Sequence, residues 1–451
     1  MPIVIFLFGT VVNLFIALSG LNFFTSFVVG EIIIVLFIVD FMRQQLLFHL
    51  YQILLLYFYF SLVLVHSFIP LDSAVYLTAY FINLFHFLFF AMGYHIKGYA
   101  DFQKPVAPKQ SPIIFSYLII SLVATVYLLM TIDIALTYSD NFRSFEDTRD
   151  LPFFEIYLGI IFSYIKSIII YTFSNPVLLA TVTVISNILS YPLHGIKGTV
   201  LSSFLLLLVL FQIFIHRFTV KSIPFVFFIS AVFIFILIGS TAFRADLSLE
   251  SIFVVLSDID ILIDSWRYFV LESPEASHVR YTSQLITFLD DGLTEFRFGF
   301  DYYRFFFYPV KWTWLNYEFA SYNQFPMLLS GRQLSVGLYL GLAGELFWNF
   351  GWVFPLFSFA YGYGLRSFSN YSFSGSYFRL AIYCLAYKSI LWHLYRGEAN
   401  AFVIVISGFL LAIFTLHCLM RFSLAKKFFK FLSKGSCNIS LRGRGAKTKH
   451  E

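Results

Sequence analysis

Apolar stretches long enough to cross a membrane follow one another along most of the chain, separated by short polar turns. A helix needs about 20 mostly apolar residues to cross a hydrocarbon core of about 30 Å. Twelve stretches reach this length when neighbours are divided at Gly, Pro, Asn or charged positions, which predicts an all-α polytopic membrane protein with about twelve transmembrane helices. Their approximate centres are Gly9, Ile32, Tyr57, Leu84, Val123, Phe162, Val184, Leu207, Phe233, Phe354, Tyr387 and Phe409.

One long polar segment, residues 243–332, interrupts the apolar pattern. It divides the chain into nine predicted helices in residues 1–242, the polar segment itself, three helices in residues 333–420 and a basic tail in residues 421–451. From Leu247 to Leu271, apolar clusters alternate with charged residues, which favours short helices that lie at the membrane surface. A water-soluble substrate is therefore expected to meet the protein at this segment.

The composition supports the membrane assignment. Hydrophobic residues make up 59% of the 451 positions, charged residues make up 12%, and mean hydropathy is +0.80. A soluble chain of this composition would expose large apolar patches. None of the three cysteines falls in a predicted outside loop, and the sequence has no CxxC or His/Cys cluster, so it predicts no disulfide on that face, no metal and no cofactor.

The placement of Lys and Arg predicts orientation, because cytoplasmic loops collect these residues. With an inside amino terminus, the inside loops contain Arg43, Lys97, Lys104, Lys109, Arg217, Lys221, Arg366 and Arg379, and nine further basic residues follow Met420. Both termini are thus expected in the cytoplasm, with residues 243–332 on the outside face. The tail supplies most of the net charge of +5, which favours contact with anionic lipid over nucleic acid.

The outside segment is acidic overall, yet most of its cations are arginine. Residues 243–332 hold twelve acidic and seven basic side chains, a net charge of −5, and six of the seven bases are Arg. An Arg fork grips phosphate or carboxylate through two parallel hydrogen bonds and stays charged when partly buried. Two interpretations stay open: several Arg side chains bind an anionic ligand, or each pairs with a nearby acid, as Asp301 with Arg304 at i, i+3 spacing.

Aromatic residues crowd the run from Asp301 to Phe319. Such rings commonly form the belt at the membrane interface. A second interpretation is a platform for sugar rings, because a pyranose presents an apolar face of C–H groups to an aromatic π surface.

Three shorter motifs belong to the same outside face. The turn YPLHGIKG, residues 191–198, has glycines that let the backbone approach a ligand, or is a plain turn between two spans. The segment from Gly341 to Trp352 places Glu345 among small residues at the membrane boundary, where a carboxylate is costly unless it has a function. The loop from His393 to Phe402 carries the sequence RGE, whose charges bind a ligand or pair with one another.

Together these features resemble the Wzy class of O-antigen and related oligosaccharide repeat-unit polymerases. The resemblance covers the order of features: about twelve spans, a mid-chain GxK turn, one large outside loop with an internal Arg, a GxxGExxxNFGW segment and a late RGE loop. It is sharpest from about Gly195 to Ala401, and the enterobacterial common antigen polymerase is a close variant of the pattern. The resemblance implies a GT-C-like architecture similar to that of the O-antigen ligases.

The resemblance also implies an activity, an inverting and metal-independent glycosyl transfer in the bacterial inner membrane. The donor would be a growing glycan on undecaprenyl diphosphate, and the acceptor would be the next lipid-linked repeat unit at the periplasmic face. Membrane lipids and a chain-length-regulating, Wzz-like co-polymerase are the implied partners. The match is imperfect, because Lys197 stands where the family often has Arg, and eleven residues rather than ten separate Arg280 from Gly292.

Candidate site residues follow from the chemistry of this transfer. A leaving diphosphate needs cations aimed at it, and the attacking hydroxyl needs a base. The candidates for diphosphate binding are Arg244, Arg280, Arg304 and Arg396, and the resemblance adds Lys197 by its position in the GxK turn. The candidate bases are His194, Glu345 and Asp301, and the candidate sugar-binding residues are Tyr302, Tyr303, Trp312 and Trp314.

Two other functions stay open from the sequence alone: an O-antigen ligase, which shares the architecture, and a flippase or other transporter of lipid-linked oligosaccharide. Transporters usually show repeated halves with charges near the membrane midplane. The long outside segment and the lack of a two-halves pattern favour the polymerase over the transporter.

Overall fold

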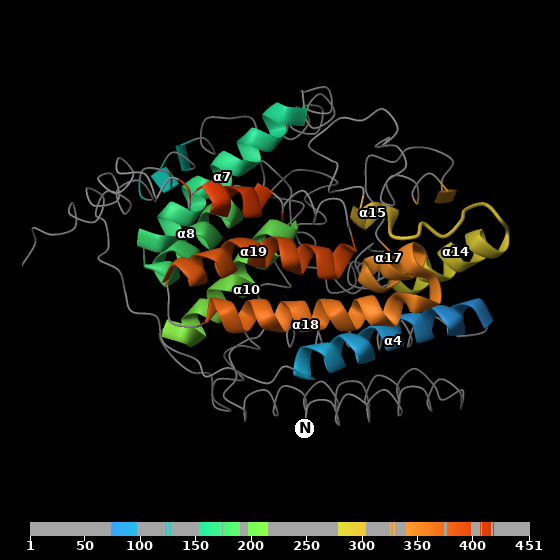
Figure 1. Cartoon of the computed structure of the whole chain (residues 1–451). Helices are drawn as coiled ribbons and strands as arrows, with labels where there is room; N and C mark the ends of the chain where they lie inside the picture. Colours follow the sequence, from blue (N-terminus) through green and yellow to red (C-terminus); the bar gives the residue numbers. More distant parts are fainter. Residues whose placement is uncertain are drawn as a thin grey trace, which may run out of the picture.

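The computed structural model describes a set of helical segments and the turns between several of them (Figure 1). All elements in this part of the chain are helices, which confirms the all-α prediction for it. The described residues are 74–96, 119, 122–123, 126–127, 153–173, 175–189, 197–214, 278–303, 325, 328–329, 340–373, 377–397, 406, 408–415 and 418.

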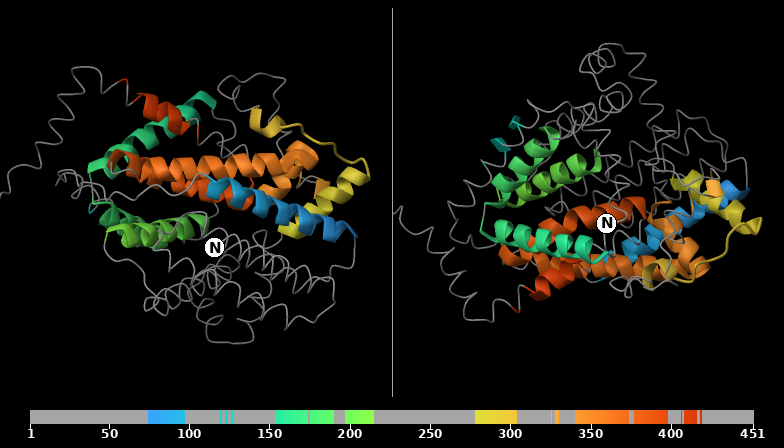
Figure 2. Two further views of the ribbon diagram at one scale, coloured as in Figure 1. Left: turned by 60° about the horizontal axis from the view of Figure 1, so that its bottom comes forward. Right: turned by 90° about the horizontal axis from the view of Figure 1, so that it is seen from above.

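Two groups of helices lie at opposite ends of the molecule, with α18 and α19 running between them (Figures 1 and 2). One group holds α7, α8 and α10, and the other holds α14, α15 and α17. The bounds are α4 Ala74–Ile96, α7 Phe153–Phe173, α8 Pro176–Leu189, α10 Lys197–Phe214, α14 His278–Asp290, α15 Phe300–Tyr303, α17 Gly341–Phe350, the 3₁₀ helix η5 Gly351–Val353, α18 Phe354–Ser372 and α19 Tyr377–Arg396.

Five predicted helix centres lie near the middle of an observed helix. These centres are Leu84 in α4, Phe162 in α7, Val184 in α8, Leu207 in α10 and Tyr387 in α19. Two more, Val123 and Phe409, are also helical, and the centres Gly9, Ile32, Tyr57 and Phe233 lie outside the described residues. Over the residues that the structure describes, no helix has both the length and the apolar content that crossing a membrane requires.

The turn between α7 and α8 shows how a short polar signal divides one apolar stretch into two helices. Asn175 precedes α8, and its side-chain Oδ1 accepts hydrogen bonds from the backbone N–H groups of Val177 (3.0 Å) and Leu178 (3.3 Å). Pro176 is the first residue of α8, a position where its missing N–H costs nothing. Asn175 is therefore the N-cap of α8, and α8 begins between the predicted spans centred on Phe162 and Val184.

The predicted single span centred on Phe354 is wrong, because a break divides this stretch into two helices. Helix α17 ends at Phe350, and Gly351 then adopts a left-handed φ of 55°, a conformation that glycine takes without steric cost. One 3₁₀ turn follows, and α18 begins at Phe354 with Pro355 in its first turn. Apolar content is continuous across the break, so the hydropathy pattern does not reveal it.

Helices α4 and α18 lie side by side and run in the same direction (Figure 1). Near one end of the interface, His86 Nδ1 lies 2.9 Å from Ser358 Oγ. Farther along both helices, the Arg366 guanidinium lies over the Tyr94 ring, 5.1 Å from its centroid, and Arg366 Nη1 donates to the Tyr94 hydroxyl at 3.5 Å. The sequence predicts Arg366 in an inside loop, which is wrong, since it lies within α18 and is buried.

Two glycines let the backbones of α4 and α18 come close together. A Cβ on Gly93 would lie 2.0 Å from the Phe359 carbonyl oxygen, and a Cβ on Gly362 would lie 2.1 Å from the Phe90 carbonyl oxygen. Any larger residue would force the helices apart. Small residues at such crossings are typical of helix pairs in membranes.

Helix α17 is the most enclosed of the described helices. It contacts α4, α14, α18 and α19, and its residues from Gly341 to Asn349 are all buried. The polar side chains of Glu345 and Asn349 therefore lie inside the protein, at the end of the molecule where the described part of the predicted outside segment, α14 and α15, also lies (Figure 1).

Candidate functional site

A buried ion pair joins α15 to the segment before it. Arg297 Nε lies 2.5 Å from Asp301 Oδ2, and Arg297 Nη2 donates to Asp301 Oδ1 at 2.9 Å. The side chains are 8% and 0% exposed, respectively. This two-point contact offsets part of the cost of taking both charges out of water. The i, i+3 partner that the sequence suggests for Asp301, Arg304, lies outside the described residues, whereas the observed partner is at i−4.

The amide of Asn349 connects this ion pair to Glu345. Its Nδ2 donates to Asp301 Oδ2 at 3.1 Å, to the Glu345 carbonyl oxygen at 3.0 Å and, at a longer 3.4 Å, to Glu345 Oε1. Its Oδ1 accepts from the Asp301 backbone N–H at 3.2 Å. All three residues are buried. Two carboxylates, one guanidinium and one amide thus form a continuous network, which we call the carboxylate cluster (Arg297, Asp301, Asn349 and Glu345).

The segment from Glu295 to Gly299 is fixed to the end of α17 by its backbone. The Arg297 N–H donates to the Trp348 carbonyl oxygen at 2.9 Å, and the Gly299 N–H donates to the Asn349 carbonyl oxygen at 2.7 Å. In return, Trp348 Nε1 donates to the Glu295 carbonyl oxygen at 3.0 Å. These bonds hold Asp301 in place over Asn349, because only Phe300 lies between Gly299 and Asp301.

Aromatic faces cover the guanidinium of Arg297. Its Cζ lies 5.0 Å from the centroid of the Trp348 ring and 5.6 Å from that of Phe300. A guanidinium over an aromatic ring is attracted by the ring quadrupole, most of all when water is excluded. The contacts restrict the orientation of Arg297 and so direct both of its donors at Asp301.

Tyr302 adds a neutral phenol beside the carboxylate cluster. Burial raises its pKa well above the ordinary value, and the nearby charges of Glu345 and Asp301 add to this effect. The hydroxyl is buried and has no hydrogen-bond partner among the residues that the structure describes. A phenol that keeps its proton and has no partner is available to donate to a ligand oxygen.

His393 brings the end of α19 to the same place. Its ring is buried and lies 6.3 Å from the Tyr302 ring and 5.5 Å from the Tyr361 ring, measured between centroids. The first residue of α14, His278, is also buried. Both histidines come from predicted outside segments.

Two glycines make this convergence sterically possible. A Cβ on Gly341, which has a φ of +70°, would lie 2.7 Å from His278 Nδ1. A Cβ on Gly397, with a φ of +74°, would lie 2.4 Å from the Gly341 carbonyl oxygen. Side chains are disfavoured at both positions by backbone conformation and by space. Gly341, the first glycine of the GxxGE motif, therefore contacts Gly397, the glycine of RGE. Gly341 also contacts His278 of α14.

Three of the residues predicted for the site lie together. Glu345 and Asp301 belong to the carboxylate cluster, and Tyr302 lies beside it. Tyr303 is exposed on α15, and Arg280 is exposed on α14, outside the cluster. Lys197 begins α10 and Arg396 ends α19. Outside the described residues lie His194, Arg244, Arg304, Trp312 and Trp314, and the side chains of Lys197 and Arg396.

The chain matches no family model, and no curated protein or solved structure is significantly similar to it. The site must therefore be understood from its own geometry.

Arg297 and Asn349 were not among the residues predicted for the site. Arg297 is one of six arginines in the long outside segment, and only its i, i+4 spacing to Asp301 distinguishes it. Asn349 belongs to the NFGW motif, but no hydrogen-bond partner was predicted for its amide. Within the described part of the chain, no group of three or more His, Cys, Asp or Glu side chains is arranged to hold a metal ion.

The carboxylate cluster divides its two acids into different chemical roles. Arg297 and Asn349 both donate to the Asp301 carboxylate, so hydrogen bonds engage both of its oxygens. Glu345 Oε1 accepts a longer hydrogen bond from Asn349, and Glu345 lies next to the Tyr302 phenol. Of these two carboxylates, Glu345 is the better candidate for accepting a proton from a substrate.

Proposed function

We propose that the protein is a membrane-embedded polymerase of oligosaccharide repeat units, of the O-antigen type. It would transfer a growing glycan from undecaprenyl diphosphate to the next lipid-linked repeat unit at the periplasmic face of the bacterial inner membrane. The observation that carries the proposal is the carboxylate cluster itself. Three segments predicted on the outside face, α14–α15, Gly341–Trp352 and the end of α19, meet around these buried acids.

The distribution of polar and apolar side chains supports a membrane location. Between α4 and α18, His86 and Arg366 are buried, whereas large apolar side chains such as Phe162, Ile185 and Leu356 are exposed on helix surfaces. Ionisable residues in membrane helices face the bundle interior, and apolar residues face lipid. The close approach of α4 and α18 at glycines agrees with the same location.

Helix direction supports the proposed topology. The parallel contact of α4 with α18 requires Ala74 and Phe354, the first residues of the two helices, to lie on the same side. The predicted topology agrees with this, because it runs the spans centred on Leu84 and Phe354 in the same direction, from the outside face inward. It also places the last residue of α19, Arg396, on that face, and Gly397 contacts Gly341 there.

The proposed reaction is a single displacement with inversion at the anomeric carbon. A hydroxyl oxygen of the acceptor forms a bond to the donor's anomeric carbon while the bond to the diphosphate oxygen breaks. The acceptor's proton goes to Glu345, and the electron pair leaves with the diphosphate. General-base help of this kind contributes about 10²–10⁴-fold to the rate. Asp301 and Arg297 would position Asn349, and the Tyr302 hydroxyl would donate to an oxygen of the bound sugar.

Cations must stabilise the departing diphosphate, since negative charge develops there in the transition state. We assign this role to the basic residues predicted around the site, Lys197, Arg244, Arg280, Arg304 and Arg396. No metal is required in this scheme, because guanidinium and ammonium groups supply the positive charge.

The genetic test is replacement of the chromosomal gene by Glu345→Gln. This variant keeps the shape of the side chain and removes the base, so we expect polymer to fall by at least about 100-fold, while single repeat units still reach the surface. Asp291→Asn, a change of an exposed acid beside the end of α14, is the matched control and should leave long chains normal. Long chains at wild-type level in Glu345→Gln would overturn the proposal.

A transporter is the second candidate, favoured by the buried Arg366 and His86 between α4 and α18, because transporters place charges near the membrane midplane. The surface glycan of a deletion strain separates the functions. Loss of a polymerase leaves core with one repeat unit, loss of a ligase leaves bare core, and loss of a flippase traps the units inside the cell.

A further inference from the structure

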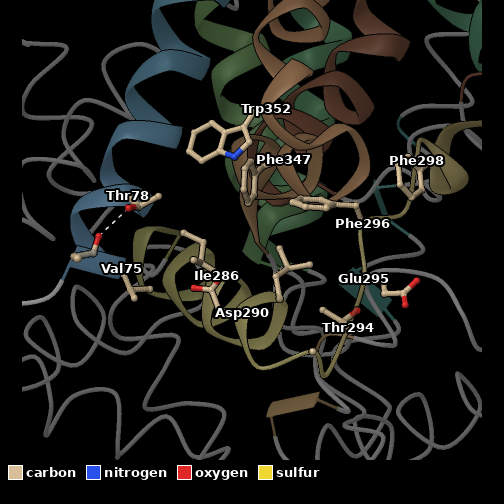
Figure 3. A pocket seen from close by; sticks show the side chains of 13 residues that line it. Val75, Thr78, Ile286, Asp290, Thr294, Glu295, Phe296, Phe298, Phe347 and Trp352 are labelled. Carbon is tan, nitrogen blue, oxygen red and sulfur yellow. Dashed lines mark hydrogen bonds between the residues drawn. The ribbon is translucent and has the colours of Figure 1, made fainter.

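A pocket of about 710 Å³ opens between α4, α14 and the end of α17. In the view of Figure 3, the rings of Trp352, Phe347 and Phe296 lie on one side of the space, and Ile286 and Asp290 lie on the other. Small-molecule sites commonly have volumes of about 300–1,000 Å³. The pocket lies outside the carboxylate cluster, and the reaction scheme above does not use it.

Two aromatic side chains at this pocket are unusually exposed. The side chains of Trp352 and Phe298 are 63% and 82% accessible. Phe298 also has a φ of 50°, and it is the one non-glycine residue with positive φ in the described part of the chain. Such a conformation is unfavourable for a bulky residue and tends to persist where function requires it. Here it turns the Phe298 ring outward, while its neighbours Arg297 and Gly299 stay bonded to α17.

Polar groups around the same pocket are hydrogen-bond acceptors. The side chains of Asp290 and Glu295 are exposed, and no cation among the described residues pairs with either. The Thr78 hydroxyl donates to the Ala74 carbonyl oxygen at 2.8 Å, which leaves its own oxygen as an acceptor. A ligand that fits these groups must bring several donors, and it must bring an apolar face for the rings.

We infer that this pocket binds a pyranose ring of the acceptor repeat unit, an inference that rests on the proposed polymerase function. A pyranose has both required features, because its hydroxyls donate and its C–H face stacks on aromatic rings. The two carboxylates select against a negatively charged sugar. The pocket therefore favours a neutral or N-acetylated sugar over a uronic acid.

The pocket is connected to the carboxylate cluster through α17 and the segment after α14. Phe347 lines the pocket, and Asn349, two residues later, belongs to the cluster. Glu295 lines the pocket, while its carbonyl oxygen accepts the Trp348 indole hydrogen bond. A ring held in the pocket would thus be held against the same backbone that positions Asp301.

The direct test is saturation-transfer NMR on the full chain in lipid nanodiscs. The probes are methyl β-glucopyranoside, methyl N-acetyl-β-glucosaminide and methyl β-glucuronide. We expect signal from the first two and much weaker signal from the glucuronide. Trp352→Ala should weaken binding of the neutral probes about tenfold, whereas Tyr363→Ala, which removes an exposed ring of α18 outside the pocket, should leave binding unchanged.

A second measurement separates this inference from the polymerase proposal. With lipid-linked repeat units as substrate, Trp352→Ala should raise the acceptor KM about tenfold and leave kcat near wild type. If the glycosides bind and no polymer forms, the polymerase proposal fails and the pocket stands. If polymer forms, with no glycoside binding and an unchanged KM in Trp352→Ala, the pocket inference is wrong. Choline binding that depends on Asp290 and Glu295, with no glycoside binding, would also overturn it, since the pocket would then be a cation site.

Discussion

Helices α17 and α18 are neighbours in sequence, joined by Gly351–Val353, yet they bury polar residues for different purposes. In α17, Glu345 and Asn349 bond to each other and to Asp301 of a distant segment. In α18, Ser358 contacts His86 of α4, and Arg366 contacts Tyr94 of α4. The contacts of α17 bring ionisable groups from distant segments into one cluster. The contacts of α18 connect two helices along their length.

The difference teaches that burial of a polar residue is not by itself a sign of chemistry. In α17, the buried Asn349 bonds to Asp301, a charged residue of a distant segment that is itself paired with Arg297. Substitutions in the carboxylate cluster test whether it stabilises the protein as a charge network. Substitutions between α4 and α18 test whether that interface depends on close helix packing.

The largest stability effect is expected for Arg297→Ala. Removing Arg297 leaves Asp301 buried without its cation, which should lower the free energy of unfolding by about 3–5 kcal/mol. The measurement is denaturant unfolding of the purified protein in detergent micelles. Arg280→Ala removes an exposed arginine of α14 and should change stability by no more than about 0.5 kcal/mol. Equal losses in the two variants would show that the ion pair does not stabilise the site.

The helix contact is tested by Gly362→Ala. The new Cβ would lie 2.1 Å from the Phe90 carbonyl oxygen, so α18 must move away from α4, at a cost of about 1–3 kcal/mol. Gly364→Ala is the matched control, because no atom lies within 4 Å of its new Cβ. It should instead stabilise α18 by about 0.5–1 kcal/mol through helix propensity. Unfolding transitions of the two variants should therefore shift in opposite directions, and a shared direction would contradict the close contact.

The smallest effect is expected for Ser358→Ala. It removes the hydrogen bond to His86 and should cost about 1 kcal/mol, with polymer formation unchanged. Ser367→Ala, which alters an exposed hydroxyl that donates to the Tyr363 carbonyl oxygen of its own helix, should cost less than about 0.5 kcal/mol. A loss of polymer in Ser358→Ala with little loss of stability would move His86 into the chemistry and break the distinction between the two helices.

Hydropathy located five helices close to their centres, because the length of an apolar stretch is a local property of the sequence. It missed the break at Gly351, since apolar residues continue on both sides and only the backbone of one glycine changes direction. It also placed Arg366 in a loop, because a charge count treats every basic residue as a loop residue and cannot identify Tyr94 as its contact.

The site was predictable where a motif carried an unusual residue. Glu345 stood out as a carboxylate among apolar neighbours, and Asp301 and Tyr302 stood out at the start of an aromatic run. The contacts among them were not predictable. Asp301 and Asn349 are 48 positions apart in the sequence. Both Arg297 and Arg304 lie at helical spacing from Asp301, so the sequence was compatible with either as its ion-pair partner. The pocket aromatics Trp352 and Phe298 come from different segments, so no sequence pattern unites them.

The most direct test of the account is a reconstituted reaction. The purified chain in liposomes is supplied with lipid-linked repeat units and excess EDTA, and products are separated by size. We predict a ladder of polymer with release of undecaprenyl diphosphate from the wild type, and only single units from Glu345→Gln. A folded wild-type protein that leaves the substrate unpolymerised, or a full ladder from Glu345→Gln, would contradict the claim that the carboxylate cluster is a centre of glycosyl transfer.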